Sequence, residues 1–585
     1  MYNEYEIRPM PLSLPYCRKR VELFLAKNGL RLDEVDYYAC VFRLGDDEEI
    51  LAGGGFKGRV IKCIAVNDTL REEGFSSRLI SHLMSEANQQ GHDSVSVFTK
   101  PENRDIFEAM GFQLIAKASR AILLEYGNGL RDYCHYLSGQ RRLGRSGVIV
   151  MNGNPFTLGH RYLIKEAARQ VEWLHIIIVR EELSLFSYAE RLEMVRRGTA
   201  DLLNVNVIEG SDYAVSSTTF PTYFLKQLSD ATDIQILLDL DLFAHFIAPH
   251  LGIHVRFVGT EPTDLTTGRY NELMKVTLQA RGYEVVEIDR KCGDDGKAVS
   301  ASRVRALLAE GNYSAASMLC PPSTHPFLLS QLAAQALQQE LDTTPKPGLV
   351  DKHDSGAHTD MDYALMKKSI EVLHPWLTKM ALVATDCKDN VPKQIQALGI
   401  EAEKAMLTAT GGVNTHRGAL FSMGLTLAAV AYELATKEQE HGQRLTAETL
   451  QQRIALLAHH FTSPDNTHGA AIRPEGSTRG AVASAQGGYK LLFGSWLPYY
   501  QQHRDDPYVN HQLLLLIISE LDDTNIVFRK GEEKAHEIKT LAREALSHFS
   551  VETLEELNRQ FIQDHVSPGG AADMLALALF VQGFF

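Results

Sequence analysis

The pattern of apolar residues changes at Cys320-Pro321-Pro322, and this change restricts the fold of the 585-residue chain more than any other feature. Before this point, short apolar runs separated by polar turns predict strands. After it, stretches rich in Ala, Leu, Glu and Gln predict helices alone. Since a single hydrophobic core stops growing at about 250 to 300 residues, the chain is predicted to be multidomain, with an all-α C-terminal domain over residues 325–585.

Residues 1–128 predict a mixed α+β domain. Apolar runs between Tyr37 and Val66 predict strands joined by a hairpin at 45–47. Further strands are expected at 95–98 and 121–125, and helices at 76–88 and 105–110.

Residues 145–320 have a different sequence pattern, in which short apolar runs alternate with segments predicted to be helical. This alternation predicts an α/β domain with a parallel, doubly wound sheet, whose ligand binds at the carboxyl ends of the strands. The expected strands are 148–151, 174–179, 234–240, 255–258 and 285–288.

Composition argues against several classes of partner. A formal net charge of -14 repels phosphate backbones, so no nucleic acid partner is expected. The apolar, uncharged stretch from Gly418 to Tyr432 is shorter than the ~20 residues of a membrane span and predicts a buried helix instead. The first residues lack a secretory signal, and the seven cysteines form no C-x-x-C pair. We therefore expect a cytoplasmic protein without a membrane partner.

In the first domain, Arg71-Glu72-Glu73-Gly74-Phe75-Ser76 lies between a strand and a helix. This segment resembles the pyrophosphate loop of the GNAT acetyltransferases, and Asn103 to Phe112 resembles their second cofactor segment. The resemblance implies a GNAT-like fold in which Arg71 and Gly74 bind acetyl-CoA. A structural or docking module without acetyl transfer is the alternative.

In the second domain, Thr157-Leu158-Gly159-His160 lies where the first strand turns into a helix. Amides at a helix N-terminus bind phosphates, and Gly159 permits close approach of a nucleotide. His160 can donate a hydrogen bond or a full positive charge to the oxygen between the α and β phosphates. Thr157 and His160 are thus candidate catalytic residues, and Asn154, Phe156 and Gly159 candidate nucleotide-binding residues.

Near the end of this domain, Ser300, Ser302 and Arg305 can bind the β and γ phosphates from a second helix N-terminus. Val299 to Arg305 resembles the Ile-Ser-Ser-Thr-x-x-Arg signature of nucleotidylyltransferases, as Thr157 to His160 resembles their His/Thr-x-Gly-His signature. The resemblance implies a Rossmann-like domain that binds ATP, with Arg305 catalytic.

Four other residues of this domain are open to two interpretations. Arg180 and Arg191 are either phosphate clamps or surface arginines. Asp239 and Asp241 either end a strand and contact ribose or metal, or cap a helix that begins at Leu242.

Residues 152–164, 184–187 with Arg191, and 258–262 with Tyr270-Asn271 are similar to the citrate lyase ligase family, over nearly all of residues 1–320. The resemblance implies that ATP and Mg²⁺ activate acetate as acetyl-adenylate, with release of pyrophosphate. The acetyl group would pass to the thiol prosthetic group of the citrate lyase acyl carrier protein.

Five polar clusters interrupt the helices of the C-terminal domain, at 345–351, 355–361, 410–418, 522–525 and 567–573. Carboxylates suit Mg²⁺, and Lys, Arg and glycine amides suit phosphates. The ordered set resembles the triphosphoribosyl-dephospho-CoA synthase family, which implies that ATP and dephospho-CoA are substrates and adenine is released. The candidates are Asp522 and Asp523 for catalysis; Lys346, Gly348, Asn414, His416, Arg417, Gly569 and Gly570 for binding; Asp351, Asp360 and Asp573 for metal; and His358.

One residue departs from that family's pattern. Ala481 follows Arg479-Gly480 where the family is expected to carry Glu, which predicts weakened activity. Two alternatives stay open for the chain: transfer of AMP to a small phosphate ester, and a scaffold that binds the carrier protein and has inactive flanking domains.

Overall fold

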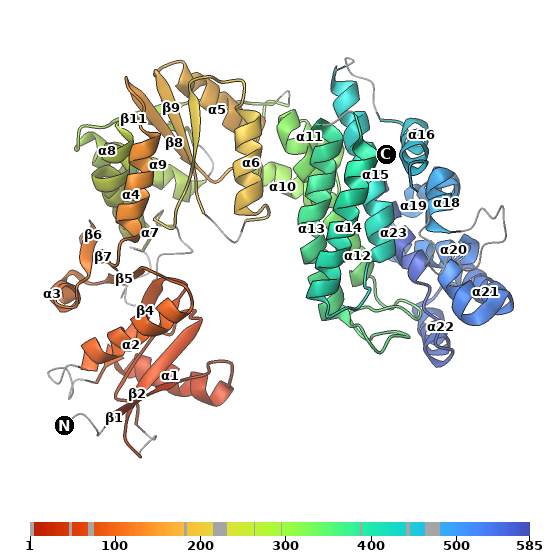
Figure 1. Ribbon diagram of the computed structural model, residues 1–585, viewed down its shortest axis with the longest axis horizontal. Helices are drawn as coiled ribbons and strands as arrows, with labels where there is room; N and C mark the ends of the chain where they lie inside the picture. The colour runs from red at the N-terminus through yellow and green to blue at the C-terminus, as the bar shows by residue number, and fades with distance from the viewer. Residues whose placement is uncertain are drawn as a thin grey trace. The chain divides into compact units, whose positions relative to one another are not determined.

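The computed structural model describes residues 5–45, 49–67, 75–180, 184–213, 231–261, 264–293, 295–386, 389–439, 445–461 and 480–585. The chain forms two compact units, residues 1–299 and 300–585 (Figure 1). The first combines two sheets with helices and the second is helical, which confirms the multidomain α/β prediction with a helical C-terminal half.

The first sheet has the order β1-β2-β3-β4-β5-β7-β6. Its strands are antiparallel apart from β4 and β5, which pair in parallel only at Val60 with Ser96 and Ile61 with Val97. The predicted β2–β3 pairing is confirmed, although part of its turn lies outside the described residues. The bounds are β1 Tyr5–Pro9, β2 Tyr37–Arg43, β3 Ala52–Lys57, β4 Val60–Val66, β5 Val95–Thr99, β6 Gln113–Lys117 and β7 Ile122–Tyr126, with helices α1 Pro15–Lys27, α2 Phe75–Gln89 and α3 Arg104–Glu108.

The second sheet has five parallel strands in the order β10-β9-β8-β11-β12. The order reverses between β8 and β11, and such a switch point leaves a crevice at the carboxyl ends of the strands. The bounds are β8 Ser146–Met151, β9 Trp173–Ile178, β10 Val205–Glu209, β11 Ile253–Gly259 and β12 Glu284–Ile288, with helices α4 Gly129–Gln140, α5 Leu158–Ala168, α6 Tyr188–Gly198 and α9 Leu265–Gln279.

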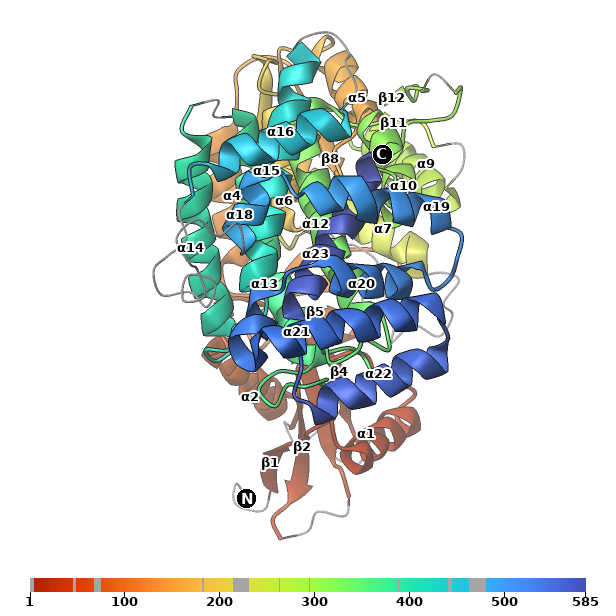
Figure 2. The same cartoon turned by 90° about the vertical axis from the view of Figure 1, so that its right-hand side faces the viewer.

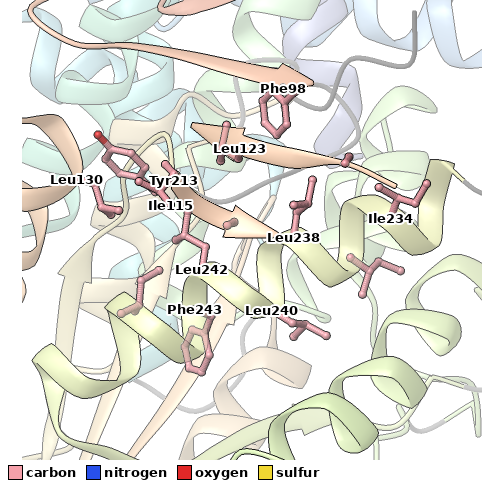
Figure 3. Close-up of a cluster of buried hydrophobic side chains, with 14 of the residues drawn as sticks. Phe98, Ile115, Leu123, Leu130, Tyr213, Ile234, Leu238, Leu240, Leu242 and Phe243 are labelled. Atoms are coloured by element: carbon pink, nitrogen blue, oxygen red, sulfur yellow. The ribbon is translucent and has the colours of Figure 1, made fainter. Parts of the chain in front are cut away.

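The strand predicted at 234–240 is wrong, because this segment belongs to helix α7, Ala231–Leu242. The helix has apolar side chains on both sides. In Figure 3, Leu238 lies toward Leu123 of the first sheet, whereas Leu240 and Phe243 lie on the opposite side of the helix. A helix with apolar side chains on both sides loses the 3.6-residue apolar period, and the alternation of Ile and Leu with polar residues here resembles the pattern of a strand. A π-helical turn, η4 Phe243–Ile247, and α8 Ala248–Leu251 follow.

The second unit has helices throughout its described residues (Figure 2). Helix α23 is buried on nearly every side and packs against α12, α15, α20 and α21. The bounds are α10 Ala301–Ala309, α11 Tyr313–Ser317, α12 His325–Asp342, α13 Tyr363–Asp386, α14 Val391–Ala409, α15 Arg417–Gln439, α16 Ala447–Ala458, α18 Ala481–Gln486, η6 Leu492–Trp496, α19 Leu497–His503, α20 Val509–Glu520, α21 Thr524–Ser547, α22 Val551–Gln563 and α23 Gly569–Val581.

Two helical segments among the described residues have the length and hydropathy of a membrane span, Thr232–Leu251 and Arg417–Thr436. Within each, 61% and 72% of the residues respectively are buried inside the protein. Core helices of this kind pass the same test as membrane spans, and the prediction that 418–432 forms a buried helix is confirmed.

Candidate active sites

The loop after β8 fixes the orientation of His160. Thr157 caps α5, and its Oγ1 accepts a hydrogen bond from the backbone N–H of His160 at 3.3 Å. In return, the backbone N–H of Thr157 donates to Nδ1 of His160 at 3.1 Å. Because Nδ1 accepts this bond, the proton of a neutral imidazole is on Nε2, which is free to act as a donor.

The surroundings of His160 favour its neutral form. Burial and, to a smaller extent, the positive charge of Arg290 together lower the pKa of His160 to about 4. A desolvated imidazole beside a guanidinium resists a second positive charge. Of the two predicted forms, the structure therefore favours the neutral hydrogen-bond donor at pH 7.

Two predicted nucleotide-binding residues support the loop from within the protein. The ring of Phe156 is fully buried and stacks on that of His160, with centroids 6.0 Å apart. Asn154 is also buried, and its Oδ1 accepts a hydrogen bond from the backbone of Phe186 at 3.2 Å. These contacts hold the shape of the loop.

The switch point gathers polar groups from β11 and β12. Arg290, two residues after β12, donates from Nε to the carbonyl oxygen of Thr260 at 2.6 Å and forms an ion pair with Glu261. Arg290 was not predicted from the sequence, although its position after the last strand of a parallel sheet could have indicated a residue of the binding site. A guanidinium whose position is fixed by Thr260 and Glu261 thus acts on His160.

Gly159 lies close to the backbone of Val299. A Cβ atom at Gly159 would lie 2.6 Å from the carbonyl oxygen of Val299. Only glycine permits this approach. Val299 directly precedes Ser300 in the chain.

The second predicted phosphate loop begins α10 in the second unit. Oγ of Ser300 caps this helix, accepts from the backbone N–H of Arg303 at 3.3 Å, and lies 3.2 Å from Oγ of Ser302. Arg305 follows within the first two turns and is half-buried.

Neither interpretation of Arg191 is right. Its side chain is fully buried, and its guanidinium donates to the carbonyl oxygens of Phe186 (3.1 Å), Asn152 (2.8 Å) and Val179 (2.8 Å). Arg191 is a positioning residue that joins the loops after β8 and β9. Arg180 is exposed, donates to the carbonyl of Gly210 at 3.1 Å, and lies over the ring of Tyr188.

Asp239 and Asp241 neither end a strand nor cap a helix, because both lie inside α7. Asp239 accepts a hydrogen bond from the hydroxyl of Tyr270. Asp241 pairs with Arg281 at 2.5 Å and accepts from the backbone of Lys117 at 2.8 Å. The carboxylate of Asp241 thus connects helix α7 to the first sheet. Arg71 and Gly74, by contrast, lie outside the described residues.

In the second unit, Lys346 and Glu340 form an ion pair deep in the interior, where their side chains are 1% and 5% exposed. Burial raises the pKa of Glu340, and the charge of Lys346 opposes this rise. Glu340 was not predicted, because it follows two glutamines in the last turns of α12, where a surface position is expected.

His416 lies close to this pair. Its Nδ1 is 2.9 Å from Oγ of Ser369, and its buried Nε2 has no partner among the described residues. Burial lowers the pKa of His416 to about 3, with a smaller contribution from the charge of Lys346. The imidazole is therefore neutral and has one polar atom available for a ligand.

Asp573 and Asp523 form an acidic pair beside these residues. Oδ2 of Asp523 accepts from the backbone N–H of Gly570 at 2.9 Å. Burial, followed by the negative charges of Glu340 and Asp523, raises the pKa of Asp573 well above its usual range. The charge of Asp573 in turn acts on Tyr489, whose buried hydroxyl has no partner among the described residues. The acidic pair is a place where a cation or a proton is favoured.

In the first polar cluster, residues 345–351, the side chain of Asp351 stabilises the loop in which it lies. Asp351 is 1% exposed and accepts hydrogen bonds from the backbone N–H groups of Lys346, His353 and Asp354, at 2.9, 2.7 and 3.2 Å. Gly348 has a φ of +69°, and a Cβ there would lie 2.2 Å from the carbonyl oxygen of Val566. Three backbone donors therefore occupy the carboxylate of Asp351.

The second cluster borders a cavity of about 530 Å³, lined by residues that include Ser355, Asp360 and Lys368. Nε2 of His358 lies 2.7 Å from Oγ of Ser567, and its Nδ1 lies 3.6 Å from Asp360, which is exposed. The second and fifth clusters thus meet at His358.

The remaining predicted residues lie nearer the surface. Asn414 accepts from the backbone N–H of Arg417 at 3.2 Å, and Arg417 pairs with Glu403. Gly569 begins α23, and Ala481 begins α18 with an exposed side chain. Across the residues that the structure describes, no group of three or more His, Cys, Asp or Glu has a metal-binding arrangement.

Comparison with families of known proteins divides the chain at nearly the same place as the change in its apolar pattern. Residues 146–328 match the model described as citrate lyase ligase C-terminal domain. Residues 326–584 match the model described as ATP:dephospho-CoA triphosphoribosyl transferase.

Individual relatives resemble each half. A citrate (pro-3S)-lyase ligase of Klebsiella pneumoniae is 42% identical over 324 residues, which are 54% of this chain and 93% of the relative. A probable 2-(5''-triphosphoribosyl)-3'-dephosphocoenzyme-A synthase of Pseudomonas putida is 36% identical over 266 residues, which are 43% of this chain and 93% of the relative. Among solved structures, Thermotoga maritima TmcAL bound with alpha-thio ATP is similar over 56% of this chain and 98% of its own, with 11% identity and a TM-score of 0.21.

Proposed function

Because the chain belongs to the citrate lyase ligase family in its first half and to the triphosphoribosyl-dephospho-CoA synthase family in its second, we propose that it carries out two steps in the maturation of citrate lyase. It is a ligase and a transferase in one chain. The first half acetylates the thiol prosthetic group of the acyl carrier protein of citrate lyase, and the second makes the precursor of that group.

The ligase reaction begins with ATP and acetate. An oxygen of acetate attacks the α phosphorus of ATP, the bond from that phosphorus to the bridging oxygen breaks, and pyrophosphate leaves. The carrier thiol then attacks the acetyl carbon of acetyl-adenylate, and AMP leaves. The protein's task is to stabilise the charge that develops on the leaving pyrophosphate.

The orientation of His160 carries this proposal. Its Nδ1 is held by the backbone N–H of Thr157 at 3.1 Å, so a neutral imidazole directs an Nε2–H donor at the departing bridging oxygen. Amides at the start of α5, including that of Gly159, would bind phosphate oxygens. We propose that Ser300, Ser302 and Arg305 bind the β and γ phosphates, because hydroxyls at a helix N-terminus and a guanidinium suit phosphate oxygens.

In the transferase reaction, the bond between adenine and the anomeric carbon of ATP breaks, and a hydroxyl oxygen of dephospho-CoA forms a bond to that carbon. The hydroxyl proton leaves with adenine, and the triphosphate stays on the ribose. Such a carbon acquires positive charge in the transition state, which a neighbouring carboxylate stabilises. We propose that Asp523 supplies this carboxylate and that Nε2 of His416, which has no partner among the described residues, contacts the base or the ribose.

Mg²⁺ commonly binds between substrate phosphates and one or two carboxylates. Asp573 and Asp523 fit this requirement, because their mutual repulsion would be relieved by a cation. The ion would neutralise charge on the triphosphate. We propose that Lys346, Gly348, Asn414, Arg417, Gly569 and Gly570 contribute to phosphate binding, and that Asp351 and Asp360 support the first two loops.

We also propose a GNAT-like fold for residues 1–128 and a Rossmann-like fold for residues 145–320, with residues 325–585 as the third domain. The short parallel contact between β4 and β5 favours the first, since these strands separate beyond Ile61 and Val97. An opening between two strands suits an extended cofactor such as acetyl-CoA, which Arg71 and Gly74 would contact. We place the protein in the cytoplasm.

Product analysis of the intact chain tests both activities. Incubation with ATP and acetate should release pyrophosphate, and incubation with ATP and dephospho-CoA should release adenine. His160→Ala should remove only the first activity and Asp523→Asn only the second. Pyrophosphate release that requires a phosphate ester in place of acetate would instead indicate adenylyl transfer, and absence of both products would indicate a scaffold.

A further inference from the structure

A buried arginine in the second sheet has unused hydrogen-bond donors. Arg256 of β11 is 4% exposed. One of its terminal nitrogens donates to the hydroxyl of Tyr270 at 2.9 Å. Its Nε and other terminal nitrogen are buried and have no partner among the described residues. Donors of a charged group left unpaired in the interior cost several kcal/mol, so an anion or ordered water is favoured beside them.

Aromatic groups hold the guanidinium in place. Its central carbon lies 4.5 Å from the ring centroid of Phe243 and 5.6 Å from that of Tyr270. The hydroxyl of Tyr270 donates to Asp239 on α7, so this nearby carboxylate is already engaged. The plane of the arginine is therefore fixed, while part of its donor edge stays open.

The guanidinium borders a cavity of about 30 Å³. Its walls include Val150, Ile177, Phe243 and Ile247, which are apolar. A cavity needs roughly 10–15 Å³ to hold one water, so this space admits a group of a few heavy atoms. It is too small for a phosphate chain, and Asp239, which also borders it, already accepts a hydrogen bond from Tyr270.

The position of the cavity connects it to the nucleotide loop. Val179 and Gly210 line it and directly follow strands β9 and β10. Val150 also lines it and precedes the last residue of β8, after which the loop that carries His160 begins. The cavity thus lies at the carboxyl ends of the strands, where a ligand of a parallel sheet is expected.

We propose that this cavity is the subsite for the small carboxylate that attacks ATP, with the guanidinium of Arg256 pairing with the carboxylate and the apolar walls enclosing its alkyl group. This inference rests on the proposed ligase function. The size of the cavity limits the acid to about two carbons.

The experiment measures binding and turnover separately on the intact chain. Line broadening of ¹³C-labelled acetate, recorded without ATP, reports binding directly. Acetate-dependent pyrophosphate release gives KM for acetate and for ATP. In Arg256→Gln, acetate broadening should disappear and KM for acetate should rise about tenfold or more, with KM for ATP unchanged. Arg256→Lys, which keeps the charge, should lie between Arg256→Gln and the wild type.

The second variant, Ile247→Ala, is expected to gain activity, and misfolding cannot produce a gain. Ile247→Ala enlarges the cavity and should lower KM for propionate relative to acetate. The inference is overturned if Arg256→Gln binds acetate as the wild type does, since ordered water would then satisfy the arginine. It is also overturned if Ile247→Ala leaves the preference between the acids unchanged. Wild-type protein that binds ¹³C-acetate but releases no pyrophosphate would refute the ligase function and leave the subsite standing.

Discussion

Asp522 and Asp523 are consecutive in the chain, but their carboxylates have different partners. Oδ2 of Asp523 accepts the backbone N–H of Gly570 at 2.9 Å, and the residue is 8% exposed. Oδ1 of Asp522 pairs with Nζ of Lys539 at 2.5 Å, and its side chain is 63% exposed. Only Asp523 belongs to the interior group that includes Asp573.

This difference predicts unequal effects of two matched substitutions. Asp523→Asn removes a charge next to the proposed reaction centre and should lower adenine release about 100-fold or more. Asp522→Asn removes only a surface ion pair, which contributes at most about 1 kcal/mol, and should leave adenine release within about twofold. The measurement is the rate of adenine release from ATP and dephospho-CoA. Equal losses of this rate in both variants would contradict the assignment of Asp523, and not Asp522, to the reaction centre.

The contact between Gly418 and Asp573 predicts a steric effect. A Cβ atom at Gly418 would lie 2.0 Å from Oδ2 of Asp573, so Gly418→Ala must displace that carboxylate. Adenine release should fall about tenfold or more, and stability by about 1–3 kcal/mol. Gly399→Ala is the control, since its Cβ would meet Cε of Met380 at an ordinary 3.9 Å. Both variants should retain pyrophosphate release, because Gly418 and Gly399 lie in residues 325–585, outside the residues proposed for the ligase reaction.

The five polar clusters of the C-terminal domain could be found from the sequence, because helix packing alone gives little reason for Gly, Asp and His at so many helix ends. The sequence could not show which members of these clusters lie in the interior and which lie at the surface. Asp522 and Asp523 are identical in chemistry, and only the position of α21 against α23 separates them. Glu340 and Tyr489 were missed because their local sequences do not mark them: Glu340 follows two glutamines, and Tyr489 follows two glycines.

The sequence also predicted four of the five strands of the second sheet, since a parallel sheet buried on both faces produces continuous apolar runs. The edge strand β10 was missed because its residues are only partly buried. The strand predicted at 234–240 was wrong because α7 is apolar on both sides. A helix with apolar side chains on both sides lacks the 3.6-residue apolar period by which a helix is predicted from its sequence.

Substitution of Arg191 is expected to lower the stability of the protein strongly. Arg191→Met would leave three backbone carbonyl oxygens, those of Asn152, Val179 and Phe186, without their donor. Each unpaired buried acceptor costs about 1–3 kcal/mol, so the first unit should lose roughly 3 kcal/mol or more. Arg180→Ala, at an exposed site, should cost less than about 1 kcal/mol. Urea unfolding of the intact chain measures both, and equal midpoints for the two variants would show that Arg191 is not a positioning residue.

The depressed pKa of His160 predicts how stability depends on pH. The ordinary pKa of histidine is 6.5 and that of His160 is about 4. Between these values the unfolded chain binds a proton that the folded chain does not, so His160 lowers stability as pH falls from about 6.5 toward 4. His160→Gln should reduce this dependence. Melting temperatures of the two proteins at pH 7 and pH 5 should therefore differ less for the variant than for the wild type.

The same shift predicts how the ligase reaction depends on pH. If neutral His160 donates its Nε2–H to the bridging oxygen, kcat/KM for ATP in acetate-dependent pyrophosphate release should show no fall with a midpoint near 6.5, and should decline only as pH approaches about 4. Arg290→Gln removes a positive charge that lowers this pKa, so the acid limb of the profile should move to higher pH. A rate that instead rises as pH falls through 6.5 would mean that the imidazolium is the active form, and an acid limb that Arg290→Gln leaves in place would mean that it belongs to another group.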